Sequence, residues 1–406
     1  MNLHRFPAVA AAASHGRVLA DNAAGAQLPD TALERVQEYL TYRNAQKGSI
    51  FSRTVATSEL VEEAKAEFAA LIEVPAAHVG VGANATSIAM ALSRLIASTI
   101  ARGDRIVVTA ADHEANVAPW IWLRRFGAQI DVVPVDENGD LDETKYRAFL
   151  EREPVLVALP WASNATGTVF DIARLARMAK ATRALVIVDG VQAFPHFPLD
   201  LDAAIDFAFF SAYKMYAPHF GFWYAAAGLL DRFVRTDDAF VPGGDARYWT
   251  LECGTQNFEG LAGWLGTVAY FRSVAAMPRL AIGLFAEHEK LVAAYARARF
   301  EERADHLRLY GRGAGRERLP VFAFNVNGMT SEALGERFES ARIEARVGDY
   351  YAPRLMQRLA PESNGRALRL SFAHYNGVRD VDRCFAVIDE AIAAVHESAD
   401  AEAVSS

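Results

Sequence analysis

Two ionisable side chains follow two separate apolar runs of this chain, and together they suit one kind of chemistry. Asp189 follows the run Leu185–Val188, and Lys214 comes shortly after the run Phe207–Phe210. Such runs are typical of strands buried on both faces of a parallel sheet, and ligands usually bind beyond the carboxyl ends of these strands. A lysine amine there could form a Schiff base (an aldimine) with pyridoxal phosphate, and a carboxylate could keep the pyridine nitrogen of that cofactor protonated. Taken singly, each side chain is more often an ordinary loop residue, so the prediction depends on their combination and order.

The segments that must position these side chains alternate between strand-like and helix-like patterns from Val79 to Phe210. This alternation predicts a mostly parallel sheet with helices on both faces. After a glycine-rich break at residues 241–245 and a long helix over residues 280–306, shorter elements predict a smaller α+β unit. The last helix is expected over residues 378–395, followed by a frayed tail.

A possible phosphate site precedes the first helix of this alternating region. The strand Val79–Gly82 ends in small residues, and a helix is predicted to begin near Ala85. Free backbone N–H groups and the helix dipole favour an anion at such a helix start. Many strand-to-helix turns look alike, so the pattern alone is a weak signal.

Two motifs make a family resemblance specific. Asp189-Gly-Val-Gln192 and Ser211-Ala-Tyr-Lys214 resemble the class V aminotransferase family, and the match extends from about Leu19 to about Cys384. Members of that family include cysteine desulfurases, selenocysteine lyases, kynureninases and isopenicillin N epimerases. The resemblance implies pyridoxal phosphate as cofactor and the fold called type I, with a mostly parallel seven-stranded sheet in a large domain and a small α+β C-terminal domain. We therefore expect an N-terminal segment over residues 1–20 that joins the small domain, a large domain over residues 21–270 and a small domain over residues 271–406.

The resemblance also implies site roles, residue by residue. Lys214, Asp189 and His113 would be catalytic, with His113 stacked on the cofactor ring. Cofactor contacts would come from Asn84, Ala85, Thr86, His113, Asn164, Asp189, Gln192, Ser211, Tyr213, Lys214 and Thr255. Without the resemblance, His113 would more often be a structural histidine, and Asn164 could equally form an Asx turn.

Substrate contacts are expected from three residues far apart in the sequence. Arg369 would clamp the α-carboxylate of an amino acid, because a guanidinium matches a carboxylate with two hydrogen bonds. Asn22 lies in a small-residue loop that the family places near the substrate. Tyr351, with its neighbour Tyr350, is a candidate proton donor or pocket wall.

The chain departs from the desulfurases at one loop. Those enzymes carry a nucleophilic cysteine before the arginine strand, whereas residues 346–352 here read Arg-Val-Gly-Asp-Tyr-Tyr-Ala. The two cysteines, Cys253 and Cys384, lie elsewhere in the sequence. The chain therefore resembles a cysteine desulfurase/selenocysteine lyase-like branch that lacks the loop cysteine, and persulfide formation at this loop is not expected. Other elimination chemistry needs no such thiolate.

The amino-acid composition limits which binding partners and which cellular compartment are expected for this chain. The net charge of −8 argues against binding to nucleic acid or to a membrane surface, and no apolar run approaches the roughly 20 residues that span a membrane. Two cysteines exclude a disulfide framework and a cysteine zinc site, so we expect a cytoplasmic protein without a metal site. The apolar stretch Pro7–Ala13 is interpreted as a helical or frayed N-terminus rather than a signal peptide. By the resemblance, we expect a homodimer in which Thr255 reaches the partner's cofactor phosphate.

Several reactions remain open at this point. We expect C–S cleavage or another β-elimination on an amino acid first, on family proximity, with transamination or epimerisation as the alternative. A scaffold that does not turn over substrate on the same fold is a further possibility, which the presence of Asp189, Lys214 and Arg369 together disfavours.

Overall fold

The structure is a computed structural model, and it describes residues 3–233, 251–252, 254–311 and 318–405. The predicted glycine-rich break at residues 241–245 and the residue Cys253 lie outside these ranges.

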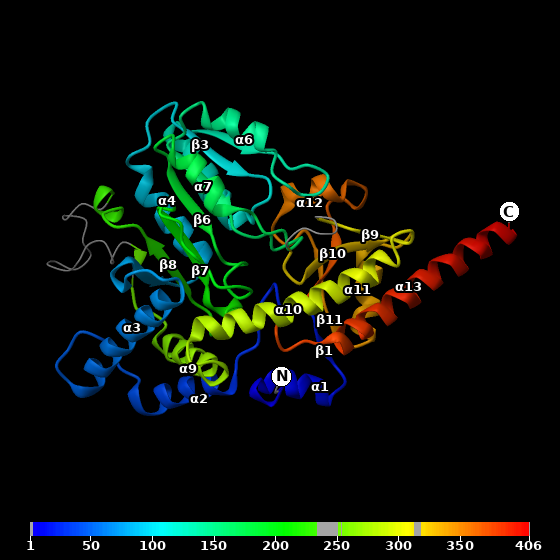
Figure 1. The fold of residues 1–406 in the computed structure, drawn as a ribbon, viewed down its shortest axis with the longest axis horizontal. Coiled ribbons are helices and arrows are strands. Elements are labelled where there is room, and N and C mark those ends of the chain that lie inside the picture. The colour runs from blue at the N-terminus through cyan, green and yellow to red at the C-terminus, as the bar shows by residue number, and fades with distance from the viewer. Residues whose placement is uncertain (1–2, 234–250, 253, 312–317, 406) are drawn as a thin grey trace.

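A seven-stranded sheet forms the centre of the structure (Figure 1). Its strands, in spatial order, are β2 (Val79–Gly82), β8 (Gly221–Ala225), β7 (Phe207–Ser211), β6 (Leu185–Asp189), β5 (Leu156–Pro160), β3 (Arg105–Thr109) and β4 (Gln129–Val133). Strands β7, β6, β5, β3 and β4 run parallel, whereas β8 runs antiparallel to both of its neighbours. The mostly parallel, seven-stranded sheet predicted from the sequence is therefore confirmed.

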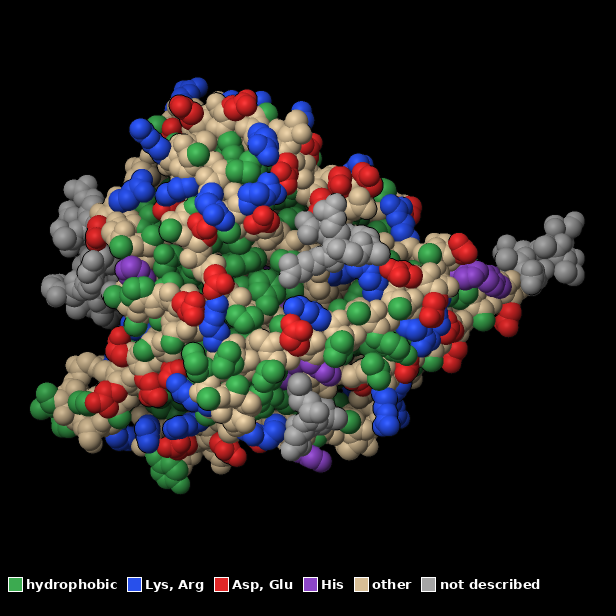
Figure 2. All heavy atoms as spheres, in the orientation of Figure 1, with side chains coloured by type: hydrophobic (Ala, Val, Ile, Leu, Met, Phe, Trp, Pro, Cys, Tyr) green, Lys and Arg blue, Asp and Glu red, His purple; other side chains and the backbone are tan. Residues whose placement is uncertain are grey.

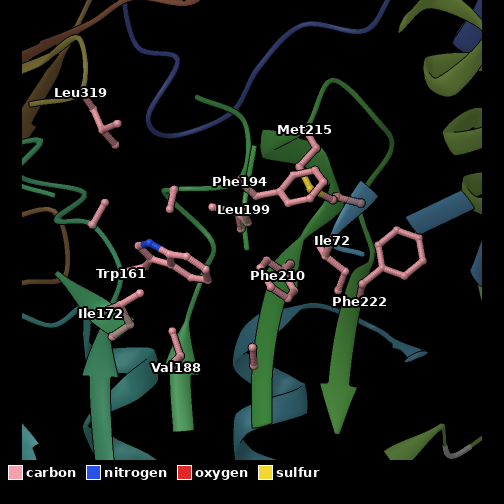
Figure 3. Close-up of a cluster of buried hydrophobic side chains, with 14 of the residues drawn as sticks. Ile72, Trp161, Ile172, Val188, Phe194, Leu199, Phe210, Met215, Phe222 and Leu319 are labelled. Atoms are coloured by element: carbon pink, nitrogen blue, oxygen red, sulfur yellow. The ribbon is translucent and has the colours of Figure 1, made fainter. Parts of the chain in front are cut away.

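Both faces of this sheet are buried, because successive residues of a strand point to opposite sides. On β6, Val186 and Val188 belong to one hydrophobic core, and Leu185 and Ile187 belong to another. Figure 3 shows part of the first core, in which Val188 lies on a strand next to the one that carries Phe210. Helices α6 (Glu143–Leu150) and α7 (Ile172–Lys180) pack on the first core, and α4 (Ala85–Ala97) and α5 (Ala118–Trp122) pack on the second. This packing explains why the strands read as continuous apolar runs.

The carboxyl ends of the parallel strands meet at one edge of the sheet. Asp189 ends β6 and Ser211 ends β7. The segment after β3 carries His113, and the segment after β5 carries Asn164. The fold therefore gathers side chains from four strand ends at the edge where ligands bind in α/β proteins.

A second, antiparallel sheet follows the long helix. Its strands, in spatial order, are β12 (Arg346–Gly348), β13 (Ala367–Ser371), β10 (Val321–Val326) and β9 (Leu307–Leu309). Helices α10 (Pro278–Glu301), α11 (Ser331–Ser340), α12 (Pro353–Leu359) and α13 (Val378–Ser405) surround this sheet. Near the N-terminus, β1 (Val18–Leu19) pairs in parallel with β11 (Ile343–Glu344). The domain boundaries at residues 20 and 270 stay a prediction.

The remaining helices are α1 (Pro7–Ser14), α2 (Asp30–Glu38), α3 (Ser52–Leu71) and α9 (Phe258–Val274), of which α2 and α3 pack against α9. Two predicted helix ends were wrong. The long helix ends at Glu301 instead of residue 306, and α13 continues to Ser405 instead of ending at residue 395. The segment after Val395 contains no glycine or proline, so nothing in the sequence stops the helix there.

Within the described residues, no single helix has the length and hydropathy of a membrane span; α9 and α10 pass that test only as a pair bent by 72°. Figure 2 shows acidic and basic side chains interspersed over the visible face.

Candidate active site

A cavity of about 500 Å³ opens beside the carboxyl edge of the large sheet. A narrower cavity adjoins it, and both are lined by Thr86, His113, Ala115, Asn164, Tyr213 and Lys214. The predicted site residues that line one or both cavities are Ala85, Thr86, His113, Asn164, Asp189, Gln192, Ser211, Tyr213, Lys214, Tyr351 and Arg369. Three predicted residues are not among the lining residues: Asn22, Asn84 and Thr255.

Asp189 and Lys214 are both buried, and burial drives each toward its neutral form. Burial raises the pKa of Asp189 to about 6, although the N–H of Val191, which donates to Oδ1 at 2.9 Å, and the Lys214 ammonium oppose this shift. Burial and the positive charge of Arg369 together lower the pKa of Lys214 to about 8, against the opposing charge of Asp189. A lysine with this pKa is partly a free amine near neutral pH, as a nucleophile or a base must be.

His113 is held as a neutral imidazole. Its Nδ1 accepts a hydrogen bond from the backbone N–H of Ala115 at 3.0 Å, so the ring proton is on Nε2. Burial, with smaller contributions from the charges of Lys214 and Arg369, lowers the pKa of His113 to about 4. The ring centroid lies 5.6 Å from that of Tyr351. A flat, neutral ring in the shared wall of both cavities fits the predicted position beside a cofactor ring.

The lowered pKa of His113 predicts a pH-dependent loss of stability. The unfolded chain binds the proton near pH 6.5 and the folded chain near pH 4, so His113 destabilises the fold as the pH falls through this window. Replacing His113 by Phe should therefore reduce the loss of unfolding free energy between pH 7 and pH 5 by roughly 1–2 kcal/mol. Urea unfolding of the apoprotein at both pH values measures this difference. The same substitution at the exposed His15 is the control. Equal pH dependence in the two variants would show that His113 is not held neutral by the fold.

The start of α4 offers backbone N–H groups to the cavity. Asn84 is the N-cap, and its Oδ1 accepts from the N–H of Ser87 at 2.8 Å. Ala85 and Thr86 line the narrower cavity and have no recorded hydrogen bond on their N–H groups among the described residues. Gly221 is required beside this turn, because a Cβ there would lie 2.9–3.0 Å from backbone atoms of Asn84 and Ala85. Asn84 uses Oδ1 to cap the helix, and the cofactor contacts predicted for Asn84, Ala85 and Thr86 stay predictions.

Asn164 and Arg369 meet over the larger cavity. Nδ2 of Asn164 donates to the backbone oxygen of Tyr350 at 2.8 Å, and Nη1 of Arg369 donates to the backbone oxygen of Asn164 at 2.8 Å. Oδ1 of Asn164 and Nε of Arg369 are buried without a hydrogen-bond partner in the described chain. Because a buried polar atom without a partner is costly, these two atoms are suited to a bound ligand.

Two charged residues at this site were missed by the sequence reasoning. Oδ1 of Asp21 accepts from Nη2 of Arg369 at 2.9 Å, and Oδ2 of Asp21 pairs with Nη2 of Arg346 at 2.7 Å. Arg346 also lines the larger cavity. Asp21 directly precedes the predicted residue Asn22 in the loop after β1.

The side chain of Asn22 forms hydrogen bonds with other residues of the protein. Its Nδ2 donates to the oxygens of Leu19, Ser371 and Asn376, and its Oδ1 accepts from the hydroxyl of Tyr375. Every polar atom of this side chain therefore has an internal partner. Asn22 therefore holds the loop, and the neighbouring Ala23 and Ala24 line the cavity. The substrate contact expected of Asn22 stays a prediction.

The loop that carries a cysteine in desulfurases is shaped here by two tyrosines. Tyr350 and Tyr351 have φ angles of 59° and 57°, a left-handed conformation that side chains rarely adopt and that costs about 1–3 kcal/mol per residue. The backbone oxygen of Tyr351 accepts from the N–H of Glu114 at 2.7 Å, and Glu114 forms an ion pair with Arg354. The strained loop is therefore tied to the segment that carries the imidazole.

The two tyrosines differ in what they can do. The hydroxyl of Tyr350 donates to the backbone oxygen of Ala367 at 2.5 Å, and burial raises its pKa, so Tyr350 is a wall and not a proton donor. Tyr351 is 71% exposed and lines the larger cavity, so its hydroxyl remains a candidate acid. Cys384 is fully buried in the core of the small sheet, so it does not replace the missing loop cysteine.

Thr255 lies at a different place. It is exposed and borders a small pocket with Gly82, Phe220 and Gln256. Within this chain it does not reach the cavity of Lys214, and a role toward a partner's cofactor stays a prediction.

The described side chains fit pyridoxal phosphate. The unpartnered Oδ1 of Asn164 and the N–H groups at the start of α4 supply polar contacts, and Lys214 supplies a partly free amine. Asp189 supplies a carboxylate for the ring nitrogen, and His113 supplies a flat neutral ring. The donor set matches the ring, the phosphate and the aldehyde of that cofactor.

Comparison with known proteins agrees with this donor set. The family pattern "Aminotransferase class-V" matches residues 18–384. A cysteine desulfurase of Dickeya dadantii is 30% identical over 390 residues, which cover 90% of each chain. An aminotransferase-like protein of Gibberella zeae is 27% identical over 397 residues, which cover 95% of this chain and 96% of that protein.

Solved structures agree on the fold. The apo structure of a cysteine desulfurase from Thermococcus onnurineus superposes with a TM-score of 0.86 at 22% identity and covers 97% of both chains. The structure of a cysteine desulfurase from Escherichia coli gives a TM-score of 0.80 at 24% identity and covers 96% of both. Identities this low support the fold and not the reaction.

Proposed function

This chain belongs to the class V aminotransferase family of pyridoxal phosphate enzymes, and from that membership we propose that it cleaves the C–S bond of an amino-acid substrate by β-elimination. One observation carries the assignment of residues to this reaction: Lys214 and Arg369 line the same cavity of about 500 Å³. A base and a carboxylate clamp in one cavity are what proton removal from the α-carbon of an amino acid requires.

Each side chain has a part in this reaction. Bound pyridoxal phosphate supplies an electron sink for the α-carbon. Arg369 binds the α-carboxylate and fixes the orientation of the substrate. Lys214, with a pKa of about 8, takes the proton from the α-carbon. Asp189 would keep the ring nitrogen of the cofactor protonated, and the hydroxyl of Tyr351, which lines the same cavity, would protonate the departing sulfur.

The leaving sulfur is not captured by the protein in this scheme. The loop of Tyr350 and Tyr351 contains no thiol, and Cys384 is buried elsewhere. The substrate R–S–CH₂–CH(NH₃⁺)–COO⁻ therefore loses the thiol R–SH, and the remaining fragment takes up water to give pyruvate and ammonium. This outcome differs from a desulfurase reaction, which leaves alanine and a cysteine persulfide.

Product analysis tests the reaction. The protein loaded with pyridoxal phosphate should show a visible absorption band that one member of a panel shifts; the panel contains L-cysteine, S-methyl-L-cysteine, L-alanine and L-glutamate. Equal amounts of pyruvate and methanethiol are expected from S-methyl-L-cysteine, or of pyruvate and hydrogen sulfide from cysteine. Conversion of the cofactor to its pyridoxamine form would instead assign a transaminase, in line with the aminotransferase-like relative. No absorption band after addition of the cofactor would favour a scaffold without turnover.

The partner of this chain is proposed to be a second copy of itself. Ile50 and Phe51 are 89% and 70% exposed at the start of α3, and burial of such side chains in a dimer is favourable. In that dimer Thr255 would contact the partner's cofactor phosphate. Light scattering measures the mass of the assembly, and a monomer at micromolar concentration would exclude this role for Thr255.

A cytoplasmic location is proposed from cysteine usage. The chain has two cysteines among 406 residues, and Cys384 is a buried free thiol. Cell fractionation tests this location.

A further inference from the structure

A row of three side chains connects Lys214 to the long helix α10. Nζ of Lys214 donates to Oε1 of Gln192 at 3.2 Å. Nε2 of Gln192 lies 3.5 Å from Nε2 of His196, and Nδ1 of His196 lies 2.6 Å from Oε2 of Glu289. Gln192 and His196 belong to the turn after β6, whereas Glu289 comes from α10. The row thus links helix α10 to the amine of Lys214.

The side chains of the row are buried, although His196 and Glu289 also line a separate cavity of about 560 Å³. Gln192, His196 and Glu289 are 4%, 7% and 2% exposed. In such surroundings each hydrogen bond is stronger than in water, and an unsatisfied group is costly. Burial raises the pKa of Glu289, while the neighbouring His196 opposes this shift. The geometry of the row is therefore expected to be well defined.

The carboxylate at one end determines the tautomer in the middle. An ionised carboxylate only accepts hydrogen bonds, so with Glu289 ionised the 2.6 Å contact places the proton of His196 on Nδ1. Nε2 of a neutral His196 then carries a lone pair. That lone pair can accept only from the amide NH₂ of Gln192, so the amide oxygen must point the other way, toward Lys214.

The amine at the other end demands the same orientation. A protonated Lys214 is only a donor, and it requires the oxygen of Gln192. If His196 carried its proton on Nε2, the amide would turn and present its NH₂ group to the lysine. Two donors would then face each other in a buried site.

We propose that Glu289 and His196 are positioning residues that keep the amide oxygen of Gln192 facing Lys214. Neither lines the substrate cavity of about 500 Å³, so we expect them to act on Lys214 through Gln192. The proposal goes beyond C–S cleavage but depends on Lys214 being the reactive amine of the proposed function. Loss of the orientation should destabilise the Lys214 ammonium and lower its pKa.

Chemical labelling of the apoprotein tests this positioning without turnover. Acetic anhydride acylates free amines, and peptide mass spectrometry gives the rate at Lys214. In Glu289→Gln the carboxylate no longer imposes the tautomer, so the rate near pH 6.5 should rise about fivefold, which corresponds to a pKa lower by somewhat less than one unit. The matched control is Glu287→Gln on the same helix, where an exposed carboxylate pairs with Lys290 at 2.8 Å. Equal rates in the two variants would overturn the proposal.

A second substitution separates positioning from general loosening of the fold. In a Gln192→Leu background there is no amide to orient, so Glu289→Gln should have no further effect on the labelling rate. If the rate still rises about fivefold there, Glu289 acts by another route and the proposal fails.

A measurement on the unaltered protein covers the case in which Glu289→Gln does not fold. Nitrogen-15 NMR of histidine-labelled apoprotein distinguishes a protonated Nδ1 from a protonated Nε2, and a His196→Gln sample assigns the signal. The expected state is a proton on Nδ1 and a free Nε2. A proton on Nε2 contradicts the proposal. Because no substrate or cofactor is present, a failed C–S lyase assignment would leave either result unchanged.

Discussion

Replacing Lys214 by alanine is expected to lower kcat/KM for the amino-acid substrate by at least about 10³-fold. The variant lacks both the amine that holds the cofactor and the base at the α-carbon, and a positioned base alone contributes about 10²–10⁴-fold. Steady-state release of keto acid, with the cofactor supplied in excess, measures the effect. The loss should appear mainly in kcat, because Arg369 still binds the carboxylate.

Stability separates this loss from unfolding. The pKa of Lys214 falls from 10.5 in the unfolded chain to about 8 in the fold, so at pH 7 the folded state holds this proton less tightly and Lys214 destabilises the apoprotein. The alanine variant should therefore unfold at a urea concentration no lower than that of the parent protein. Lys145→Ala, an exposed lysine on α6, is the control for activity. Turnover within tenfold of that control would contradict the assigned role of Lys214.

The site residues that could be predicted from the sequence are those that lie within a recognisable pattern of a few consecutive residues. Asp189 and Lys214 follow strands whose apolar runs are visible in a few consecutive residues, and the parallel sheet brings such strand ends together. The start of α4 was likewise visible as small residues between a strand and a helix. The family resemblance added Asn164, which lines both cavities and whose buried Oδ1 has no hydrogen-bond partner among the described residues.

The parts that were missed depend on contacts between distant segments. Asp21 and Arg369 form an ion pair although 348 positions separate them in the sequence. No residue pattern near either one in the sequence predicts this contact. Asn22 was predicted because the family places this small-residue loop near the substrate, and in the fold each polar atom of its side chain has an internal partner. The Glu289 contact to His196 spans 93 positions and is invisible for the same reason. Tertiary hydrogen bonds decide which polar side chains of a loop remain free for a ligand.

Arg369 has both kinds of polar atom, those with an internal partner and one that remains free for a ligand. Replacing Arg369 by lysine should raise KM about 10–100-fold, with a smaller effect on kcat. Arg369 uses Nη1 and Nη2 on the backbone oxygen of Asn164 and on Asp21, and Nε remains without a partner. A lysine keeps the charge but cannot hold both partners and also meet a substrate carboxylate in a fixed plane. One charge-assisted hydrogen bond is worth about 1.5–3 kcal/mol, which corresponds to roughly 10–150-fold in affinity.

A nearby arginine provides the comparison for this exchange. Arg366→Lys changes the same residue type just before β13, where the guanidinium is half exposed and pairs with Glu332. That variant should leave KM unchanged. A normal KM for Arg369→Lys, together with a raised KM for Arg346→Lys, would move the carboxylate clamp to Arg346, which lines the same cavity and shares Asp21. In that case Arg369 would serve to hold Asp21 and Asn164, and the ion pair between Asp21 and the two arginines would be the framework of the site rather than its substrate contact.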